Sequence, residues 1–306
     1  MSDKTAGAFK CVLCGSSDFQ IVCRTSAQPN VSGDVVSCDI CDLKSMYPLS
    51  VQSELNKRYE KNYFQCDSPL TGGYEDYESD RDFIKKTFFR RLPFFLSYFP
   101  DQKPRSVLDV GCATGIFLET MRDQGWKVSG IDVSPFAVQQ CTKKGFPVVM
   151  GNLNAGNFQN ESFDLITMWD VIEHLADPLA SLRTCFNLLK KDGLLVLSTP
   201  DAGAFLSRLL GDYWLGYRSV GEHVYFFDRQ SILKCMATSG FDIQTIRSAG
   251  KYMPIGRILT RLRYYTRIFS AILPATLPRG ERMGLYVNPG DTMMVIARKS
   301  FTKASY

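Results

Sequence analysis

The feature that most constrains the fold is a short apolar run that enters a glycine-containing loop. Ser106–Gly111 has the pattern of a buried strand, the loop 112–115 follows, and Ile116–Arg122 resumes with helical spacing. This order predicts the first unit of a Rossmann-like α/β sheet, in which glycines let the backbone approach a ligand. The next strand, Lys127–Asp132, ends in a carboxylate about twenty residues after the turn, where such folds bind a ribose.

The spacing of the glycines distinguishes two classes of nucleotide site. The dinucleotide fingerprint requires glycines two and five residues after the first, but Ala113 and Ile116 stand there, which disfavours a nicotinamide or flavin site. Residues 109–115 (DVGCATG) followed by Asp132 instead resemble the class I S-adenosylmethionine-dependent methyltransferases. The resemblance extends from about residue 105 to the C-terminus. That family often has a further glycine where this chain has Ala113.

The resemblance implies a cofactor site at the carboxyl ends of the strands. The loop glycines would follow the methionine portion of S-adenosylmethionine, and the two strand-end aspartates would orient its ammonium group and hold its ribose. Two residues after the third strand match the position that meets adenine, and a tryptophan ring at the fourth strand would attract the sulfonium. In chain order these residues are Asp109, Gly111, Gly115, Asp132, Asn152, Leu153 and Trp169.

The remaining strands are expected in the order of that family. We predict a seven-stranded Rossmann-like sheet with helices on both faces, its last two strands closing one edge and one strand antiparallel. The segments that follow the first two strands are 148–151, 163–169, 193–198, 241–246 and 291–297.

Two Cys-x-x-Cys pairs near the N-terminus, Cys11/Cys14 and Cys38/Cys41, predict a small zinc-ribbon-like domain before the sheet. Two such pairs complete the closed tetrahedral shell of structural zinc, although their separation slightly exceeds the usual ribbon spacing. A redox pair or chance is the alternative. Cys23 lacks a Cys-x-x-Cys partner and is left outside the shell. The segment has few large apolar side chains, so its folding would depend on the metal.

We therefore expect three segments, a zinc ribbon at 1–50, an aromatic helical linker at 51–100 and a methyltransferase domain at 101–306. In the linker, Tyr74 and Tyr77 follow a glycine pair and either cover a ligand or simply pack. We expect a cytoplasmic protein, because the first residues lack the apolar core of a secretory signal. Ten cysteines in such a chain indicate metal ligands and buried thiols rather than disulfides.

The chain has two histidines, and both follow predicted strands on the ligand side. Methyl transfer is an in-line displacement, so the enzyme mainly aligns the acceptor and removes its proton. His223 is the candidate base and His174 the candidate orienting group. A structural role for each is the alternative.

The run 170–174 (DVIEH) suggests a metal-dependent variant of this chemistry. If the run is helical, Asp170, Glu173 and His174 share one face, and the spacing resembles the Glu-x-x-Glu-His motif of some metal-assisted O-methyltransferases. That group includes ubiquinone-pathway and small-RNA 2′-O-methyltransferases, the latter with a downstream histidine that His223 could match. Asp170 is one methylene shorter than the family's first glutamate, so a catalytic divalent ion is the minor alternative.

Positive charge is concentrated in a lid-like insertion at about 251–285. Residues 251–283 hold seven Lys or Arg against one acidic residue. The stretch 257–273 has a helical apolar face with arginines opposite. The alternatives are a packed lid helix with a solvated basic face, an anion site for a phosphorylated acceptor, and peripheral membrane contact.

The leading functional hypothesis is O-methylation of a small molecule, sugar or polysaccharide precursor. The alternatives are RNA methylation and a non-catalytic zinc and Rossmann scaffold. The ribbon itself has too few basic residues to favour nucleic-acid binding. The identity of the acceptor and the oligomeric state lie beyond these patterns.

Overall fold

A computed structural model shows the seven expected strands in one sheet. The strand order is β10-β13-β8-β7-β4-β5-β6, and β13 runs antiparallel to the other six strands, which confirms the predicted topology. The strands are β4 (Ser106–Val110), β5 (Lys127–Asp132), β6 (Val148–Met150), β7 (Phe163–Trp169), β8 (Leu189–Pro200), β10 (Phe241–Ser248) and β13 (Thr292–Lys299). The structure describes residues 9–24, 33–49, 51–59, 61–64, 77–101, 103, 105–154, 156–218, 223–265 and 283–300.

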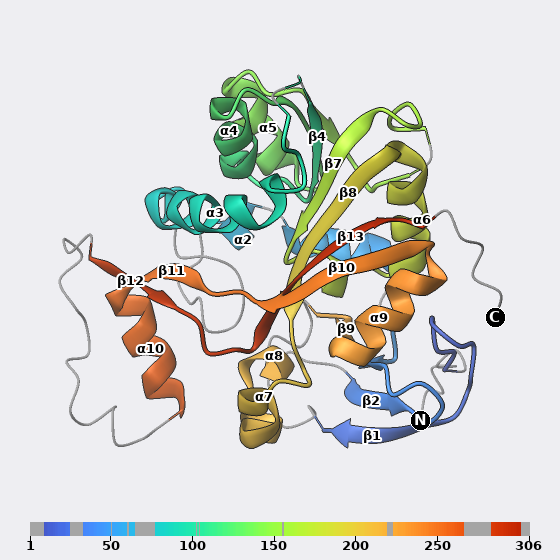
Figure 1. Cartoon of the computed structure of the whole chain (residues 1–306). Helices are drawn as coiled ribbons and strands as arrows, with labels where there is room; N and C mark the ends of the chain where they lie inside the picture. The colour runs from blue at the N-terminus through green and yellow to red at the C-terminus, as the bar shows by residue number, and fades with distance from the viewer. Residues whose placement is uncertain are drawn as a thin grey trace.

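Helices cover both faces of this sheet (Figure 1). One face packs against α3 (Arg81–Leu96), α4 (Ile116–Asp123) and α5 (Pro135–Lys143), and the other against α6 (Pro178–Leu188) and α9 (Arg229–Thr238). Alternate residues of the central strands enter the two cores, so β8 is an almost unbroken apolar run at 194–197. This two-sided burial leaves the carboxyl ends of the strands as the place for a ligand.

The N-terminal sheet is completed by a strand from far along the chain. β1 (Phe19–Cys23), β2 (Asp34–Cys38) and β3 (Lys44–Tyr47) form an antiparallel meander, and β9 (Tyr225–Phe226) pairs with β3 as the fourth strand. The core beside β2 is continuous with the core under α6 and α9. The boundary at residue 50 stays a prediction, but the module shares a sheet with the segment after β8.

The linker forms short helices that lead to α3. They are α1 (Gln52–Asn56), η1 (Lys57–Tyr59) and α2 (Lys61–Phe64). Tyr77 packs edge-to-face on Phe64, with ring centroids 5.7 Å apart, whereas Tyr74 lies outside the described residues. A 3-10 turn, η3 (Ile172–His174), follows β7, and α7 (Phe205–Leu210), η4 (Gly211–Tyr213) and α8 (Leu215–Arg218) follow β8.

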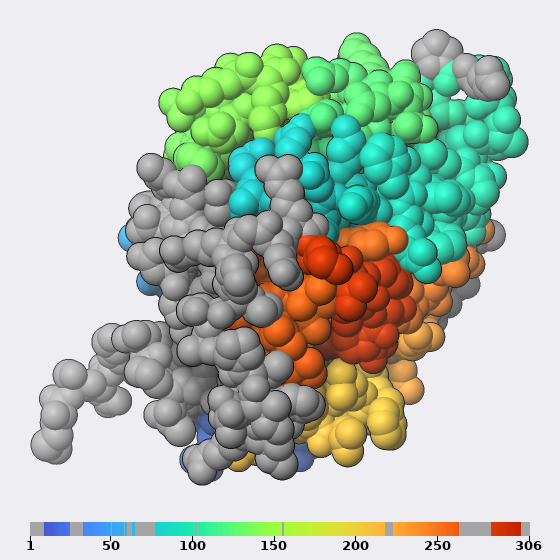
Figure 2. All heavy atoms as spheres, turned by 90° about the vertical axis from the view of Figure 1, so that its left-hand side faces the viewer, coloured from blue at the N-terminus to red at the C-terminus, as the bar shows by residue number. Residues whose placement is uncertain are grey.

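The basic insertion forms a hairpin and a helix beside α3. β11 (Lys251–Pro254) and β12 (Gly284–Val287) pair, and α10 (Ile255–Tyr265) follows β11. Figure 2 shows the hairpin, in orange and red, against α3, in teal. Part of the stretch 257–273, for which membrane contact is one alternative, lies outside the described residues. Among the described helices, none is long and apolar enough to cross a membrane.

Candidate active site

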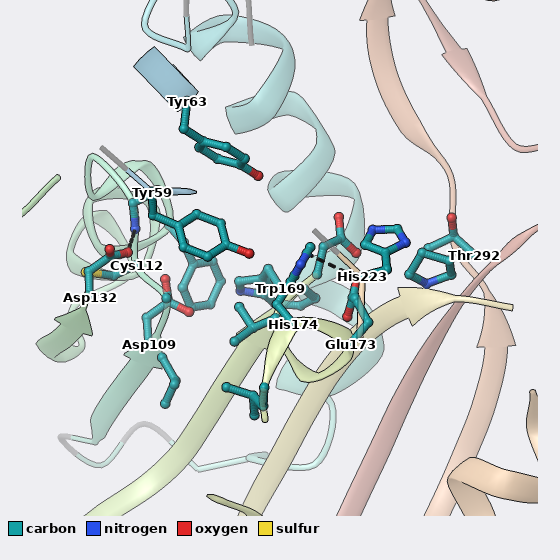
Figure 3. A pocket seen from close by; sticks show the side chains of 18 of the residues that line it. Tyr59, Tyr63, Asp109, Cys112, Asp132, Trp169, Glu173, His174, His223 and Thr292 are labelled. Atoms are coloured by element: carbon teal, nitrogen blue, oxygen red, sulfur yellow. Dashed lines mark hydrogen bonds and ion pairs between the residues drawn. The ribbon is translucent and has the colours of Figure 1, made fainter. Parts of the chain in front are cut away.

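A cavity of about 800 Å³ lies at the carboxyl ends of the parallel strands (Figure 3). Its floor comes from the ends of β4, β5 and β7, and its walls come from the linker, α3 and the basic insertion. Ten residues predicted for the site line it, namely Asp109, Gly111, Asp132, Asn152, Leu153, Trp169, Asp170, Glu173, His174 and His223. The structure therefore brings the residues predicted for the site into one cavity, with the exception of Gly115.

The glycine loop closes the cofactor end with left-handed backbone conformations. Gly111 has φ +71°, and a Cβ there would lie 2.6 Å from a methyl group of Val171. Ala113 has φ +47°, a conformation that costs an L-residue roughly 1–2 kcal/mol. Its N–H donates to Asp132 Oδ2 at 2.8 Å, and this backbone bond helps to hold the turn.

Gly115 has a structural role beside the ligand-side position that the resemblance implies. It caps α4 with φ +83°, and a Cβ there would lie 3.0 Å from Cys141 Sγ and from the Phe146 ring. Gly115 is absent from the described lining of the cavity. It lets α4 pack closely on its neighbours, and its place along the methionine portion stays a prediction.

Asp132 ends β5 with both carboxylate oxygens hydrogen-bonded to the backbone. Oδ2 accepts the Ala113 N–H and Oδ1 accepts the Ser134 N–H, each at 2.8 Å. Burial raises the pKa of this carboxyl. Each oxygen keeps a second lone pair, so the side chain can accept two ribose hydroxyls without losing its backbone partners.

Asp109 lies beneath the loop at the end of β4. It is 2% exposed, and Thr167 Oγ1 donates to its Oδ1 at 2.6 Å. Burial, with a smaller contribution from Asp132, raises the pKa of Asp109 to about 8. A cationic group bound nearby would favour the ionised form. The position fits the ammonium partner that the resemblance implies.

Trp169 lies at the end of β7 in an aromatic cluster. Its ring centroid is 5.4 Å from that of Phe88 and 5.2 Å from that of Phe117. The guanidinium carbon of Arg91 lies 5.2 Å from the same centroid. A cation therefore already contacts this ring, which weakens the expected attraction for a sulfonium. The better-supported role of Trp169 is to wall the cavity.

Three residues meet at the other end of the cavity, and we call Glu173, His174 and His223 the Glu–His–His cluster. One ligand-type atom from each lies within 4.8 Å of the others. The imidazole centroids are 4.9 Å apart, and Glu173 Oε1 lies 3.9 Å from His174 Nε2. Figure 3 shows the three side chains in one part of the cavity, with Asp109 and Asp132 at the opposite part.

The cluster is strongly desolvated. Glu173 is 1% exposed, and neither carboxylate oxygen has a hydrogen-bond partner among the described residues. Burial, and next the charge of Asp170, raise the pKa of Glu173 well above its usual value. Burial and His174 lower the pKa of His223 to about 3. Because His223 Nδ1 lies 3.2 Å from the Gly216 carbonyl, which only accepts, Nδ1 carries the proton and Nε2 keeps its lone pair.

The comparisons with known proteins agree with this geometry. Residues 79–246 match the family described as a methyltransferase domain. The chain belongs to the S-adenosylmethionine-dependent methyltransferases. A ubiquinone biosynthesis O-methyltransferase of Glaesserella parasuis serovar 5 is 30% identical to it over 174 residues, which cover 50% of this chain and 74% of that protein. The corresponding protein of Chromobacterium violaceum is 32% identical over 166 residues, with 50% and 71% covered.

A candidate methyltransferase from Bacillus halodurans C-125 shares the fold of this methyltransferase. Its solved structure has a TM-score of 0.51 and 17% sequence identity, and the match covers 69% of this chain and 99% of that one. The family membership favours an enzyme over the non-catalytic scaffold.

In this methyltransferase, Asp170 departs from the arrangement expected of a helical run. It has φ +54° and precedes the single 3-10 turn 172–174, so the run offers no common helical face. Its Oδ1 accepts from Ser198 Oγ at 2.7 Å, and its Oδ2 lies 3.8 Å from Lys251 Nζ. Burial alone would raise the pKa of Asp170, but Lys251 and Arg91 lower it. The structure puts His223 in the cluster in place of Asp170.

The sequence analysis did not single out several other residues that line the methyltransferase cavity. The ring of Tyr59, from η1, lies 5.9 Å from that of His174, edge to face. The insertion contributes Lys251, Arg257 and Arg261 to the lining. The aromatic linker and the basic segment were both visible in the sequence as regions. Only the tertiary structure shows which members face the cavity.

The four paired cysteines form a separate cluster in the N-terminal module. Cys11 Sγ lies 3.4 Å from Cys41 Sγ, and Cys14 Sγ lies 3.5 Å from Cys38 Sγ. All four sulfurs lie within 4.8 Å of one another, a donor set and size that fit tetrahedral zinc. Cys23 lies elsewhere, in a small core with Trp214, Tyr217 and Phe226.

Proposed function

We propose that this enzyme transfers the methyl group of S-adenosylmethionine to a hydroxyl of a small molecule, sugar or polysaccharide precursor. The observation that carries the proposal is the Glu–His–His cluster, which shares one cavity with the glycine loop and Asp132. The relatives named O-methyltransferases support oxygen as the acceptor atom. A cavity of about 800 Å³ suits a cofactor and a small acceptor better than RNA, the alternative acceptor.

Methyl transfer here needs alignment and one proton acceptor. The acceptor oxygen bonds to the methyl carbon as the carbon–sulfur bond breaks, and sulfur keeps the electron pair and leaves as a thioether. The hydroxyl proton passes to the Glu–His–His cluster, whose members titrate as one unit because they lie in contact. His223 offers the Nε2 lone pair for this proton, and Glu173 lies beside the imidazolium that forms.

A second candidate for the acceptor end is a divalent ion. The cluster supplies one carboxylate and two imidazoles, and the buried carboxylate oxygens of Glu173 have no hydrogen-bond partner among the described residues. These donors fit a divalent transition metal with an open position. When bound, such an ion lowers the pKa of the acceptor hydroxyl as a Lewis acid. Asp170 would then act outside the cluster, through Ser198 and Lys251.

The lid side of the cavity suits an acceptor with an anionic group. Arg91, Lys251, Arg257 and Arg261 line this side. Arg257 pairs with Asp80 and Lys251 lies near Asp170, so the lining is mixed rather than purely cationic. We infer an acceptor that carries hydroxyl groups and a single carboxylate or phosphate.

The test is a screen of acceptor pools with labelled S-adenosylmethionine. Phenols, sugars, nucleotide sugars and RNA oligonucleotides would be supplied separately. We expect label on oxygen of a small acceptor, and label on RNA or on nitrogen or carbon would contradict the proposal. Chelator treatment, with the zinc content of the cysteine cluster measured, then separates the two candidates. Resistance supports the cluster as base, and loss restored by added Mn²⁺ supports the ion.

A further inference from the structure

The N-terminal module reaches the acceptor end of the cavity through its edge strand. β3 and β9 pair antiparallel, with Lys44 opposite Phe226 and Ser45 opposite Tyr225. β9 begins two residues after His223. The backbone that carries this histidine is therefore held by a strand of the module that contains the four cysteines.

Two backbone hydrogen bonds extend this connection to the rest of the Glu–His–His cluster. The Met46 N–H donates to the Val224 carbonyl, and the Val224 N–H donates to the Glu173 carbonyl, each at 2.8 Å. Through these two bonds Val224, which is 2% exposed, bridges β3 to the turn that carries Glu173 and His174. Breaking either bond would leave a buried backbone group without a partner, which costs about 1–3 kcal/mol.

Side chains reinforce the same connection. Gln52 Oε1 accepts the Ala176 N–H at 2.9 Å, and Tyr225 Oη donates to the Ala176 carbonyl at 3.1 Å. Lys234 Nζ, on α9, donates to the Cys41 carbonyl at 3.3 Å. Side-chain hydrogen bonds therefore connect Ala176, just after His174, to the linker and to β9. They also connect the second cysteine pair to α9.

The cofactor end takes its support from a different source. The Gly111 N–H donates to the Ile131 carbonyl at 2.8 Å, and the Ala113 N–H donates to Asp132. These bonds join β4 and β5 within the large sheet. The loop that would hold the cofactor therefore depends on the sheet rather than on the cysteine module.

We propose that the zinc-loaded cysteine module positions the Glu–His–His cluster, while the cofactor end folds and binds without it. Metal binding at the four cysteines would contribute folding energy to the module, so loss of zinc should release β3, then β9 and Val224. The effect on turnover rests on the proposed function. The structural consequence does not, because it can be measured without an acceptor.

The test uses the two histidines of the chain as reporters. Labelling histidine with ¹⁵N gives two imidazole systems, one from His174 and one from His223. Cys14→Ser removes one thiolate ligand, from the exposed cysteine of the four-cysteine cluster. Cys23→Ala removes a buried cysteine outside that cluster. Zinc content, imidazole spectra, amide exchange at Val224 and affinity for S-adenosylhomocysteine would be measured for each.

For Cys14→Ser we expect loss of zinc, changed imidazole signals and at least tenfold faster exchange at Val224. Affinity for S-adenosylhomocysteine should stay within about threefold. Cys23→Ala should keep zinc and both signals. Loss of zinc with unchanged histidine signals would overturn the proposal, as would wild-type protein that binds no zinc. Loss of S-adenosylhomocysteine binding together with zinc would also overturn it, because the two ends would then not be independent.

A second variant breaks the strand connection without touching the cysteines. Met46→Pro removes the N–H that donates to Val224, and Met46→Leu keeps that N–H and nearly the same volume. We expect the proline variant to keep zinc and S-adenosylhomocysteine binding but to change the imidazole signals. Unchanged signals would contradict the proposal. Failure to find any hydroxyl acceptor would instead count against the proposed function and leave these results unaffected.

Discussion

The cofactor end and the acceptor end of the cavity are encoded in different ways. The cofactor end comes mainly from one strand–loop–helix–strand unit at 106–132, where the same short segment makes both the turn and its carboxylate. The acceptor end joins the linker, η3, the residues before β9 and the basic insertion. A local motif can therefore identify the cofactor, whereas the acceptor depends on contacts between distant segments.

The two ends also use burial differently. At the cofactor end, Asp132 is buried but accepts two backbone N–H groups. At the acceptor end, the carboxylate oxygens of Glu173 are buried with no hydrogen-bond partner among the described residues. The first arrangement is complete before a ligand binds. Burying the Glu173 carboxylate without hydrogen bonds lowers the stability of the folded protein, which is typical of a residue that takes part in catalysis.

The largest expected effect is a loss of turnover when residues of the acceptor end alone are changed. Glu173→Gln keeps the shape of the side chain, and His223→Ala removes an imidazole, so either change should slow turnover by about 10²–10⁴-fold. Affinity for S-adenosylhomocysteine should change less than about threefold. Turnover with the acceptor from the screen, together with calorimetry, measures both quantities. Glu54→Gln, an exposed carboxylate on α1, is the control. Equal losses in turnover and cofactor affinity would show that the two ends do not act separately.

The next effect breaks the cofactor end. Asp132→Ala removes the ribose acceptor and the partner of the Ala113 N–H, so affinity for S-adenosylhomocysteine should fall at least about 100-fold. The fold should persist, because the apolar packing of the helices on both faces of the sheet is unchanged. Calorimetry and circular dichroism test the two statements. Asp192→Ala, an exposed position in β8, should leave both unchanged. Wild-type affinity in Asp132→Ala would refute the ribose assignment.

Part of this comparison could be predicted from the sequence. The strands and the turn at 111–115 are local patterns of apolar runs and glycines. The arrangement of the strands and the cofactor-end residues were instead what the resemblance to class I methyltransferases implied. The four-cysteine cluster was predicted because its two pairs set their own geometry.

The remainder needed tertiary information. A two-residue strand such as β9 carries no periodicity, so its pairing with β3 and its link to Glu173 were invisible in the sequence. The helical interpretation of 170–174 was wrong for Asp170 because its left-handed backbone turns it towards Ser198. Gly115 matched a motif, but Cys141 and Phe146 explain why it is glycine.

A moderate effect is expected from the buried carboxyl of Asp109 at the cofactor end, which should make the stability of the protein depend on pH. The pKa of Asp109 is about 8, above the usual 3.8, so the native protein binds this proton more tightly than the unfolded chain. The free energy of unfolding should therefore decrease as the pH rises from about 4 to about 8. Asp109→Asn should remove this dependence and stabilise the ligand-free protein at pH 7 by on the order of 2 kcal/mol.

The same substitution should weaken cofactor binding, because the amide cannot become an anion for the ammonium group. We expect roughly tenfold lower affinity for S-adenosylhomocysteine at pH 8. For wild type, affinity should fall as the pH drops below about 8, since binding must then displace the Asp109 proton. Chemical denaturation and calorimetry across this pH range test both parts. A variant less stable than wild type at pH 7 would contradict the account.

The smallest expected effect concerns the loop backbone. Ala113→Gly relieves the left-handed strain at φ +47° but increases the entropy of the unfolded chain. The net gain in the free energy of unfolding should be at most about 1 kcal/mol, and cofactor affinity should stay within twofold. Thermal unfolding with and without S-adenosylhomocysteine measures both the stability and the cofactor affinity. A clear loss of stability would show that Ala113 is not strained.

The most direct test of a single cavity with two ends is a titration of S-adenosylmethionine into ¹⁵N-histidine-labelled protein. We predict saturable shifts of both the His174 and the His223 imidazole signals, and no shifts in Asp132→Ala at the same concentrations. Saturable binding that leaves both imidazole signals unmoved would contradict the account, because the cluster would then lie away from the transferable methyl group.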